Sequence, residues 1–205
     1  MVKIQDFFDN IYIINLKKRT DRLCHIKQEL DKINCDIYTI YEAIDGSTLN
    51  VNTKIKKGNY ALCLTTKNIL KEAKEKKFEK ILILEDDVIF KDKFNENFNN
   101  TIEHLPDDWD LFYMGANHMK PKIEYNDKID KLTYSYAAHF LGVKNTIYDV
   151  IIENIDRGEI ENDVLYANLQ SYYNAYCSKK QHVKQLASFS DIELRNVNYD
   201  FIFEK

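Results

Sequence analysis

The chain has 205 residues, of which 44% are hydrophobic, 30% charged and 13% aromatic, and its net charge at pH 7 is −4. This balance is typical of one water-soluble globular domain and excludes a disordered tail or a fibre. The acidic charge gives no general attraction for nucleic acid or anionic membranes, and no apolar run is long enough to span a bilayer.

The N-terminal residues lack the apolar stretch of a signal peptide, which favours a cytoplasmic protein. Four cysteines, Cys24, Cys35, Cys63 and Cys177, form no CxxC pair and no Cys/His set with zinc spacing. We therefore expect free thiols that are at least partly buried. A bias towards Ile, Lys and Asn suits a virus-encoded protein or one from an AT-rich bacterium.

The hydrophobic pattern alternates between strands and helices along the chain. Short apolar runs at 11–16, 37–41, 81–84, 111–115 and 134–141 predict strands. Apolar residues at helical spacing predict helices at about 23–33, 60–77, 94–102, 145–157 and 161–170. Residues 48–58 and those after 185 show little pattern. The alternation favours a single α/β domain over 1–205, with a central, mostly parallel sheet flanked by helices.

Three consecutive acids, Glu85, Asp86 and Asp87, follow the fully apolar run at 81–84. Such acids repel one another and are costly to desolvate, and a divalent cation such as Mn²⁺ or Mg²⁺ relieves both costs. Ligands of open α/β sheets bind outside the carboxyl ends of the strands, which is where these acids fall. The alternative is a solvated acidic turn, which is not rare in a chain so rich in charge.

A basic segment follows the first predicted strand. Arg19 and Arg22 carry planar guanidinium groups that suit phosphate oxygens, and Asn15 has an amide suited to a base or sugar edge. The alternative is an ordinary basic helix start, with Thr20 or Asp21 as the cap.

Four further positions have simple structural explanations when each is taken alone. Asp45 and Gly46 form a turn signal, and Asp163 is an acid at a helix start, favoured by the helix dipole. Asp191 has no informative context of its own. Gly115 follows a predicted strand, where a loop either lines a binding pocket or has no such role.

In combination, these segments resemble glycosyltransferase family 25, over roughly residues 10–193. The family includes lipooligosaccharide and collagen hydroxylysine galactosyltransferases. The segments that carry the resemblance, in chain order, are Ile14-Asn15-Leu16 with Arg19 and Arg22, Ala43-Ile44-Asp45-Gly46, Leu84-Glu85-Asp86-Asp87-Val88, the strand Asp108 to Gly115, Asn162-Asp163, and Gln185 with Ser190-Asp191-Ile192. No single motif is very specific, but their order is.

The sequence departs from the family pattern at two places. Thr65-Thr66 stands where the family usually has Ser-His, and the proline expected before Gln185 is missing. These departures bear on donor choice and on activity.

The resemblance implies a GT-A fold, a nucleotide-sugar-binding α/β domain that transfers a hexose from a UDP-sugar with inversion. UDP-galactose or UDP-glucose would be the donor, and a glycan or protein hydroxyl the acceptor. Donor-site residues would be Asn15, Leu16, Arg19, Arg22, Asp45, Gly46, Glu85, Asp86 and Gly115. Asp87 would bind Mn²⁺ or Mg²⁺, and Asp163 would be the catalytic base. Asp191 would be a second metal ligand or the alternative base.

Two alternatives from other classes remain at this point. A metal-dependent enzyme acting on phosphate esters is disfavoured, because Val88-Ile89 follows the acids where a phosphatase motif would continue. A catalytically weakened or inactive fold that binds a nucleotide sugar or a partner is motivated by the missing Ser-His.

Overall fold

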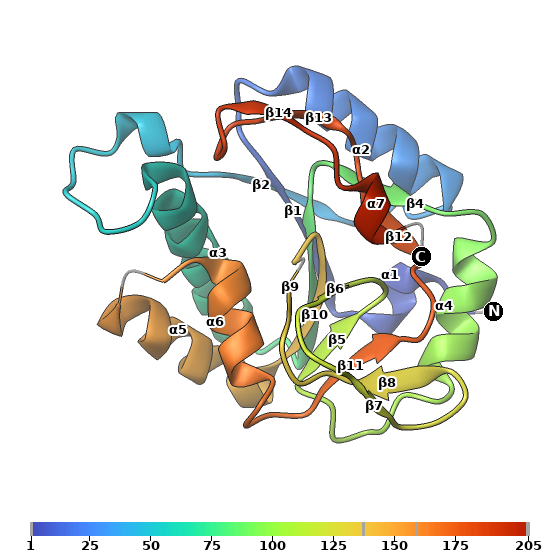
Figure 1. Cartoon of the computed structure of the whole chain (residues 1–205). Helices are drawn as coiled ribbons and strands as arrows, with labels where there is room; N and C mark the ends of the chain where they lie inside the picture. Colours follow the sequence, from blue (N-terminus) through green and yellow to red (C-terminus); the bar gives the residue numbers. More distant parts are fainter. Residues whose placement is uncertain (1, 137, 159, 204–205) are drawn as a thin grey trace.

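The computed structural model describes residues 2–136, 138–158 and 160–203. Its centre is an eight-stranded sheet with helices on both faces (Figure 1). In spatial order the strands are β2 (Thr39–Glu42), β1 (Asn10–Asn15), β3 (Lys80–Glu85), β10 (Phe140–Lys144), β5 (Leu111–Tyr113), β11 (Ala175–Ser178), β8 (Ile129–Lys131) and β7 (Ile123–Glu124). Six of the strands run in the same direction, and β10 and β8 run in the opposite direction. The sheet therefore contains both parallel and antiparallel pairs.

Strand β3 organises the core because both of its faces are covered. Ile81 and Ile83 face one apolar cluster, whereas Leu82 and Leu84 face another. The first cluster includes side chains of α3 (Lys57–Glu75), α5 (Tyr148–Arg157) and α6 (Asn162–Leu169), and the second those of α1 (Ile4–Phe7), α2 (Thr20–Lys32) and α4 (Phe94–Ile102). Alternate residues of a strand point to opposite faces, so an apolar run produces a three-layer domain.

Three small ladders lie outside the main sheet. They pair β4 (Val88–Phe90) with β12 (Val183–Gln185), β6 (Asn117–His118) with β9 (Ser135–Tyr136), and β13 (Ser188–Ser190) with β14 (Arg195–Val197). Figure 1 shows the β13–β14 hairpin beside α2, followed by the short helix α7 (Asp200–Phe203). Single 3₁₀ turns are η1 (Gly46–Thr48) and η2 (Asn145–Ile147).

The predicted helices and most predicted strands are confirmed, with boundaries shifted by a few residues. The expected strand at 134–141 is wrong as a single element, because the chain forms β9, leaves that ladder and then enters β10; residue 137 lies outside the described residues. The short strands at 117–131 and 188–197 were not predicted, since runs of two or three residues are too short to show a period.

The four cysteines are free thiols, as expected. Cys35, Cys63 and Cys177 are buried, but Cys24 is exposed on α2, which corrects the expectation that all four are partly buried. None of the helices in the described residues is both long and apolar enough to cross a bilayer.

Candidate nucleotide-sugar site

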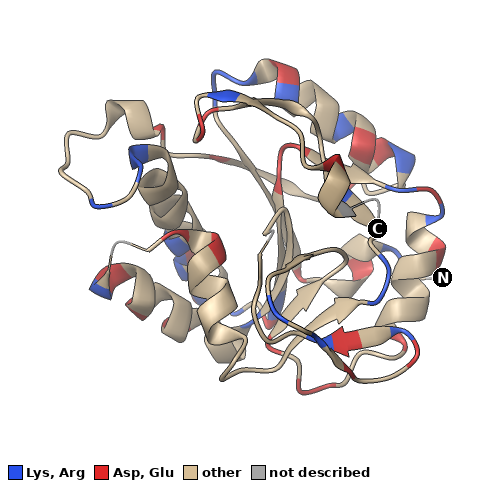
Figure 2. Cartoon of the chain, in the orientation of Figure 1, with Lys and Arg blue, Asp and Glu red and all other residues tan. Residues whose placement is uncertain are grey.

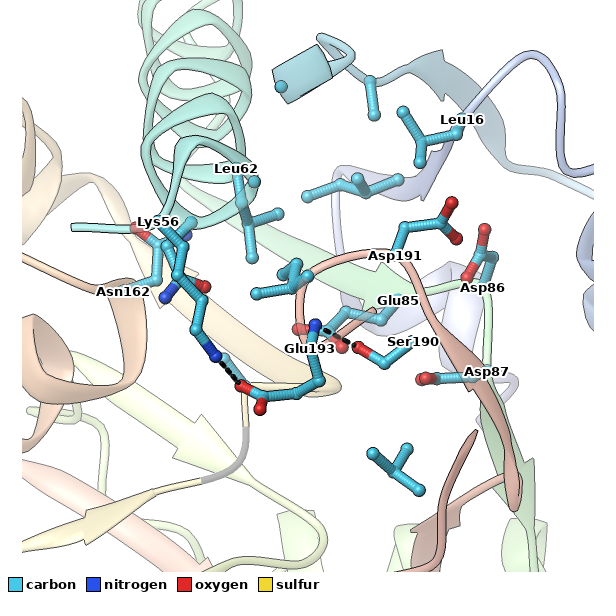
Figure 3. Close-up of a pocket in the computed structure, with 18 of the residues that line it drawn as sticks. Leu16, Lys56, Leu62, Glu85, Asp86, Asp87, Asn162, Ser190, Asp191 and Glu193 are labelled. Carbon is cyan, nitrogen blue, oxygen red and sulfur yellow. Dashed lines mark hydrogen bonds and ion pairs between the residues drawn. The ribbon is translucent and has the colours of Figure 1, made fainter. Parts of the chain in front are cut away.

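A cavity of about 830 Å³ opens where β1, β2 and β3 end at their carboxyl edge (Figure 3). Its wall also includes residues from α3, α6 and the C-terminal hairpin, so segments far apart in the sequence meet there. The predicted site residues in this wall are Leu16, Arg22, Asp45, Gly46, Glu85, Asp86, Asp87, Asp163 and Asp191. Asn15, Arg19 and Gly115 are not among the residues that line it.

The three acids lie at the turn between β3 and β4, on the floor of the cavity. Asp86 is held from two sides, since its Oδ2 accepts from Asn15 Nδ2 at 2.7 Å and its Oδ1 from Arg22 Nη1 at 2.9 Å. Asp87 Oδ2 lies 3.2 Å from the same Arg22 Nη1. Asp87 Oδ1 is buried and accepts no hydrogen bond within the described part of the chain. That oxygen therefore has its lone pairs available on the cavity floor.

Burial makes these acids unusually weak. Desolvation raises the pKa of Asp87 to about 6; Arg22 opposes the rise and the charge of Asp86 adds to it. The pKa of Glu85 is raised well above its ordinary value, first by burial and then by the charges of Asp87, Asp163 and Asp86. A cation bound in the cavity would stabilise the charged forms of all of these carboxylates.

The two arginines at the start of α2 join the acids to the C-terminal hairpin. Arg22 Nη2 donates to Ser188 Oγ and to the Phe189 carbonyl, both at 2.9 Å. Arg19 pairs with Asp191 and Asp21, and its Nη1 also donates to the Phe189 carbonyl at 3.1 Å. These contacts give both arginines a scaffolding role, while Arg22 also lines the cavity and its buried Nε has no hydrogen-bond partner in the described residues. Contact of either arginine with a phosphate stays a prediction.

Asn15 has a similar internal role. Its amide donates to Asp86 and, at 3.2 Å, to the Arg19 carbonyl, which connects the end of β1 with the acidic turn. Gly115 is closely packed, since an added Cβ would be 2.7 Å from Gln181 Oε1. None of Asn15, Arg19 and Gly115 lines the cavity, so their direct contact with a sugar donor stays a prediction.

The end of the cavity near β1 and β2 is closely packed. Asp45 Oδ1 accepts from the Ser47 N–H at 2.9 Å, which caps η1, while Lys18 Nζ lies 2.7 Å from Asp45 Oδ2. Lys18, whose hydrogen bond is the largest cause, and Ser47 together lower the pKa of Asp45 to about 2. Gly46 is required sterically, because a Cβ there would lie 2.6 Å from the Lys57 carbonyl oxygen.

Asp163 occupies the first turn of α6 on the other side of the acids. Its Oδ1 accepts from the Ala138 N–H at 3.1 Å, which orients the carboxylate beside the segment that leads into β10. The pKa of the neighbouring Glu85 responds to the charge of Asp163, so the two carboxylates are electrostatically close.

The threonines that replace the family's Ser-His connect both ends of the cavity. Thr65 Oγ1 accepts from the Ile44 N–H at 3.0 Å and donates to the Ala61 carbonyl at 2.8 Å. Thr66 Oγ1 accepts from Asn162 Nδ2 at 2.9 Å, next to Asp163. Their hydroxyls therefore support the wall, and both side chains are buried.

Several wall residues were missed by the sequence reasoning. Lys18 lies within the basic segment, but only its proximity to Asp45 and Asp191 singles it out. Lys56 comes from the unpatterned stretch before α3 and pairs with Glu193 at 2.8 Å, as Figure 3 shows. Tyr136 comes from a two-residue strand that carries no periodic signal.

Within the described residues, no three His, Cys, Asp or Glu side chains form a ready-made metal site. Asp191 was predicted as a second metal ligand, and it lies in the wall engaged by Arg19 and, at 3.8 Å, by Lys18. The acidic floor thus offers one buried carboxylate oxygen without a partner, Asp87 Oδ1, rather than a closed set of ligands.

Comparisons with known proteins agree with the motif order. The family model "Glycosyltransferase family 25 (LPS biosynthesis protein)" matches residues 8–146. Procollagen galactosyltransferase 2 of Homo sapiens is 28% identical over 137 residues, which cover 56% of this chain and 22% of that protein. A "putative glycosyltransferase" of Acanthamoeba polyphaga mimivirus is 28% identical over 145 residues, covering 64% and 45%. The chain thus spans between a fifth and a half of these relatives.

Among solved structures, a glycosyltransferase involved in the glycosylation of the major capsid of PBCV-1 aligns with a TM-score of 0.49 and 13% identity, over 80% of this chain and 74% of that one. The family match covers more than half of the chain and includes Asp45, Glu85, Asp86 and Asp87 of the cavity wall. The chain belongs to glycosyltransferase family 25.

Proposed function

We propose that this protein is an inverting, metal-dependent glycosyltransferase that moves galactose or glucose from a UDP-sugar to a hydroxyl of a glycan or protein. The observation that carries the proposal is the buried, unpartnered Asp87 Oδ1 on the floor of a cavity large enough for a nucleotide sugar. Family membership supplies the reaction class, and the chemistry of the wall supports the details.

The charge of the wall supports a metal requirement. Eight of its described residues are acidic and four are basic. The acids are Asp45, Glu85, Asp86, Asp87, Glu161, Asp163, Asp191 and Glu193, and the bases are Lys18, Arg22, Lys56 and Lys57. A nucleoside diphosphate is itself an anion, so it is repelled from such a wall unless a cation accompanies it.

The residues present fit a hard divalent cation. Mg²⁺ takes oxygen ligands and commonly binds through one or two carboxylates plus substrate phosphates and waters, and Mn²⁺ accepts the same kinds of oxygen ligand. Asp87 offers the direct carboxylate ligand, and Glu85 and Asp86 are placed to hold metal-bound water or ribose hydroxyls. When bound, the ion would neutralise the charge that develops on the departing diphosphate.

Asp191 is the second candidate ligand in this proposal. Because it is already engaged by Arg19 and Lys18, direct ligation would require it to exchange those cations for the metal. Leu16, Asp45 and Gly46 form the uridine and ribose end, opposite Asp163. Arg22 acts as a positioning residue, since it fixes the acids and the hairpin at once.

Asp163 is the proposed base. In a single displacement, the acceptor oxygen forms a bond to the anomeric carbon as the bond to UDP breaks, which inverts that carbon. The acceptor's proton passes to the Asp163 carboxylate, whose orientation is fixed by the Ala138 N–H.

Release of UDP from UDP-galactose and UDP-glucose, measured with and without Mn²⁺, tests the proposal. We expect turnover that requires Mn²⁺ and is lost in Asp163→Asn, while that variant still binds UDP. UDP binding without turnover for any donor or acceptor would favour the inactive fold, and phosphate-ester hydrolysis without a UDP requirement would favour the phosphatase class.

A further inference from the structure

The cavity has two ends that lie on opposite sides of β3. Strands β1 and β2 lie on one side in the sheet order and carry the proposed nucleotide end, with Leu16 and Asp45. Strand β10 lies on the other side, and the segment before it includes Tyr136 and Ala138 of the cavity wall. Asp163 belongs to this second end, so the acceptor must approach from the side of the β6–β9 ribbon.

The ribbon presents an aromatic surface to that end. Tyr136 belongs to β9 and Tyr134 lies in the bend just before it, with the two rings in contact. Their ring centroids are 5.6 Å apart, their planes are inclined by 57°, and their hydroxyls are 3.5 Å apart. Both side chains are half-buried, and Tyr136 lines the cavity beside its cross-strand neighbour Asn117.

The intervening residue holds this surface in place. Ser135 is buried; its N–H donates to Gln170 Oε1 at 2.7 Å and its carbonyl accepts from Gln170 Nε2 at 2.9 Å. Its hydroxyl also lies 3.0 Å from His118 Nδ1. Because these contacts fix Ser135 inward, the two tyrosines on either side are directed outward as a preformed pair, with little ordering left to occur on binding.

The charge of the proposed base, Asp163, also affects the pKa of Tyr136. The pKa of Tyr136 is raised, first by its hydrogen bond with Tyr134 and by burial, and then by the charges of Tyr134, Asp163 and Glu161. Glu161 also lines the cavity. Tyr136, Asn117, Glu161 and Asp163 all line the same cavity, so the ring shares its surroundings with two carboxylates and an amide.

We propose that Tyr136, supported by Tyr134 packed against it, forms the acceptor subsite and that the acceptor is a pyranose of a glycan rather than a peptide side chain. A pyranose ring has one face made of C–H groups, which packs on an aromatic ring, and a rim of hydroxyls, which bond to carboxylates, amides and phenols. The wall offers this combination next to Asp163. The inference rests on the proposed transferase function and names its acceptor class.

Saturation-transfer NMR on the whole chain with UDP and Mg²⁺, which unlike Mn²⁺ is diamagnetic and does not broaden the ligand signals, tests the subsite. The probes are methyl β-D-galactopyranoside, methyl β-D-glucopyranoside and a short hydroxylysine peptide. We expect one glycoside to receive saturation at its ring C–H protons. Tyr136→Leu should weaken that binding by roughly threefold to tenfold, the value of one aromatic contact, with UDP affinity within about twofold of wild type.

Two controls separate ring stacking from general damage. Tyr136→Phe keeps the ring and should retain most of the saturation, whereas Tyr172→Leu removes an exposed tyrosine outside the cavity and should change nothing. Saturation of the peptide alone, or glycoside binding that Tyr136→Leu leaves intact while UDP still binds, would overturn the acceptor subsite. Failure of the wild-type chain to bind UDP with Mn²⁺ would instead overturn the transferase function and the subsite with it.

Discussion

Replacing Asp87 with asparagine should make the protein more stable at pH 7 while removing its proposed metal ligand. Asp87 is buried, and its Oδ1 has no hydrogen-bond partner in the described structure. Burial raises its pKa from 3.8 to about 6, so the native state binds this proton more tightly than the unfolded state does. The difference of about two pKa units corresponds to a stability cost of up to roughly 3 kcal/mol once both states are ionised.

The sign of the pH dependence follows from the same difference. Between about pH 4 and pH 6 the native state holds more protons at Asp87 than the unfolded state, so the free energy of unfolding falls as the pH rises. Asparagine does not titrate. The gain from Asp87→Asn should therefore be full above pH 6 and should almost vanish near pH 4, where native Asp87 is already neutral.

Urea unfolding of the wild type and of Asp87→Asn at pH 7 and pH 4, without metal, measures this effect. Asp92→Asn is a matched control, because Asp92 is exposed and outside the cavity wall. At pH 7 we expect a gain of up to roughly 3 kcal/mol, or a rise in Tm of several degrees for a chain of this size. A variant less stable than wild type at pH 7, or a gain that is equal at both pH values, would refute the reasoning.

Three other substitutions test the scaffold of the cavity. Arg22→Met should destabilise by about 3 kcal/mol at pH 7 and by less at pH 4, because its partner Asp87, whose pKa is raised to about 6, is then neutral. Equal losses in urea unfolding at the two pH values would contradict this. Gly46→Ala places a Cβ 2.6 Å from the Lys57 carbonyl oxygen and should lower the free energy of unfolding by about 1–3 kcal/mol. It should also weaken UDP binding in calorimetry, and unchanged stability and binding would mean that the contact relaxes. Thr66→Val leaves the buried Asn162 amide without its acceptor and should lower the free energy of unfolding by about 1–3 kcal/mol, measured by thermal melting. Thr66→Ser keeps the hydroxyl and should keep the stability. Equal stability of the two variants would exclude this hydrogen bond.

The sequence was informative where apolar runs are long. The run at 81–84 predicts a strand covered on both faces, and β3 fits that description, with Glu85, Asp86 and Asp87 at its carboxyl end on the cavity floor. Motif order identified the family, which the match over residues 8–146 confirms.

The roles of the polar residues were less predictable. The sequence indicates that Arg19 and Arg22 could bind phosphate. It does not show that most of their N–H groups already donate to Asp191, Asp21, Asp86 and the Phe189 carbonyl. Asp191 and Phe189 belong to the hairpin at 188–197, whose strands are too short to leave a periodic pattern.

The sequence also did not predict the aromatic end of the cavity. Tyr134 and Tyr136 lay within an expected single strand, which would have placed them in the main sheet. The break before β10 instead puts Tyr136 on β9 and Tyr134 just before it, where Gln170 fixes the intervening Ser135. A tertiary contact 35 residues away in the chain decides this orientation.

Binding of UDP with and without Mn²⁺, followed by thermal melting of the wild-type chain, tests the central claim most directly. A ligand at 100 times its Kd adds about 2.7 kcal/mol, which is roughly 5–10 °C in Tm at this chain length. If the acidic cavity binds the diphosphate through a cation on Asp87, UDP should raise Tm only when Mn²⁺ is present, and Asp87→Asn should abolish the rise. An equal rise without Mn²⁺, or no rise with any uridine nucleotide, would contradict the account.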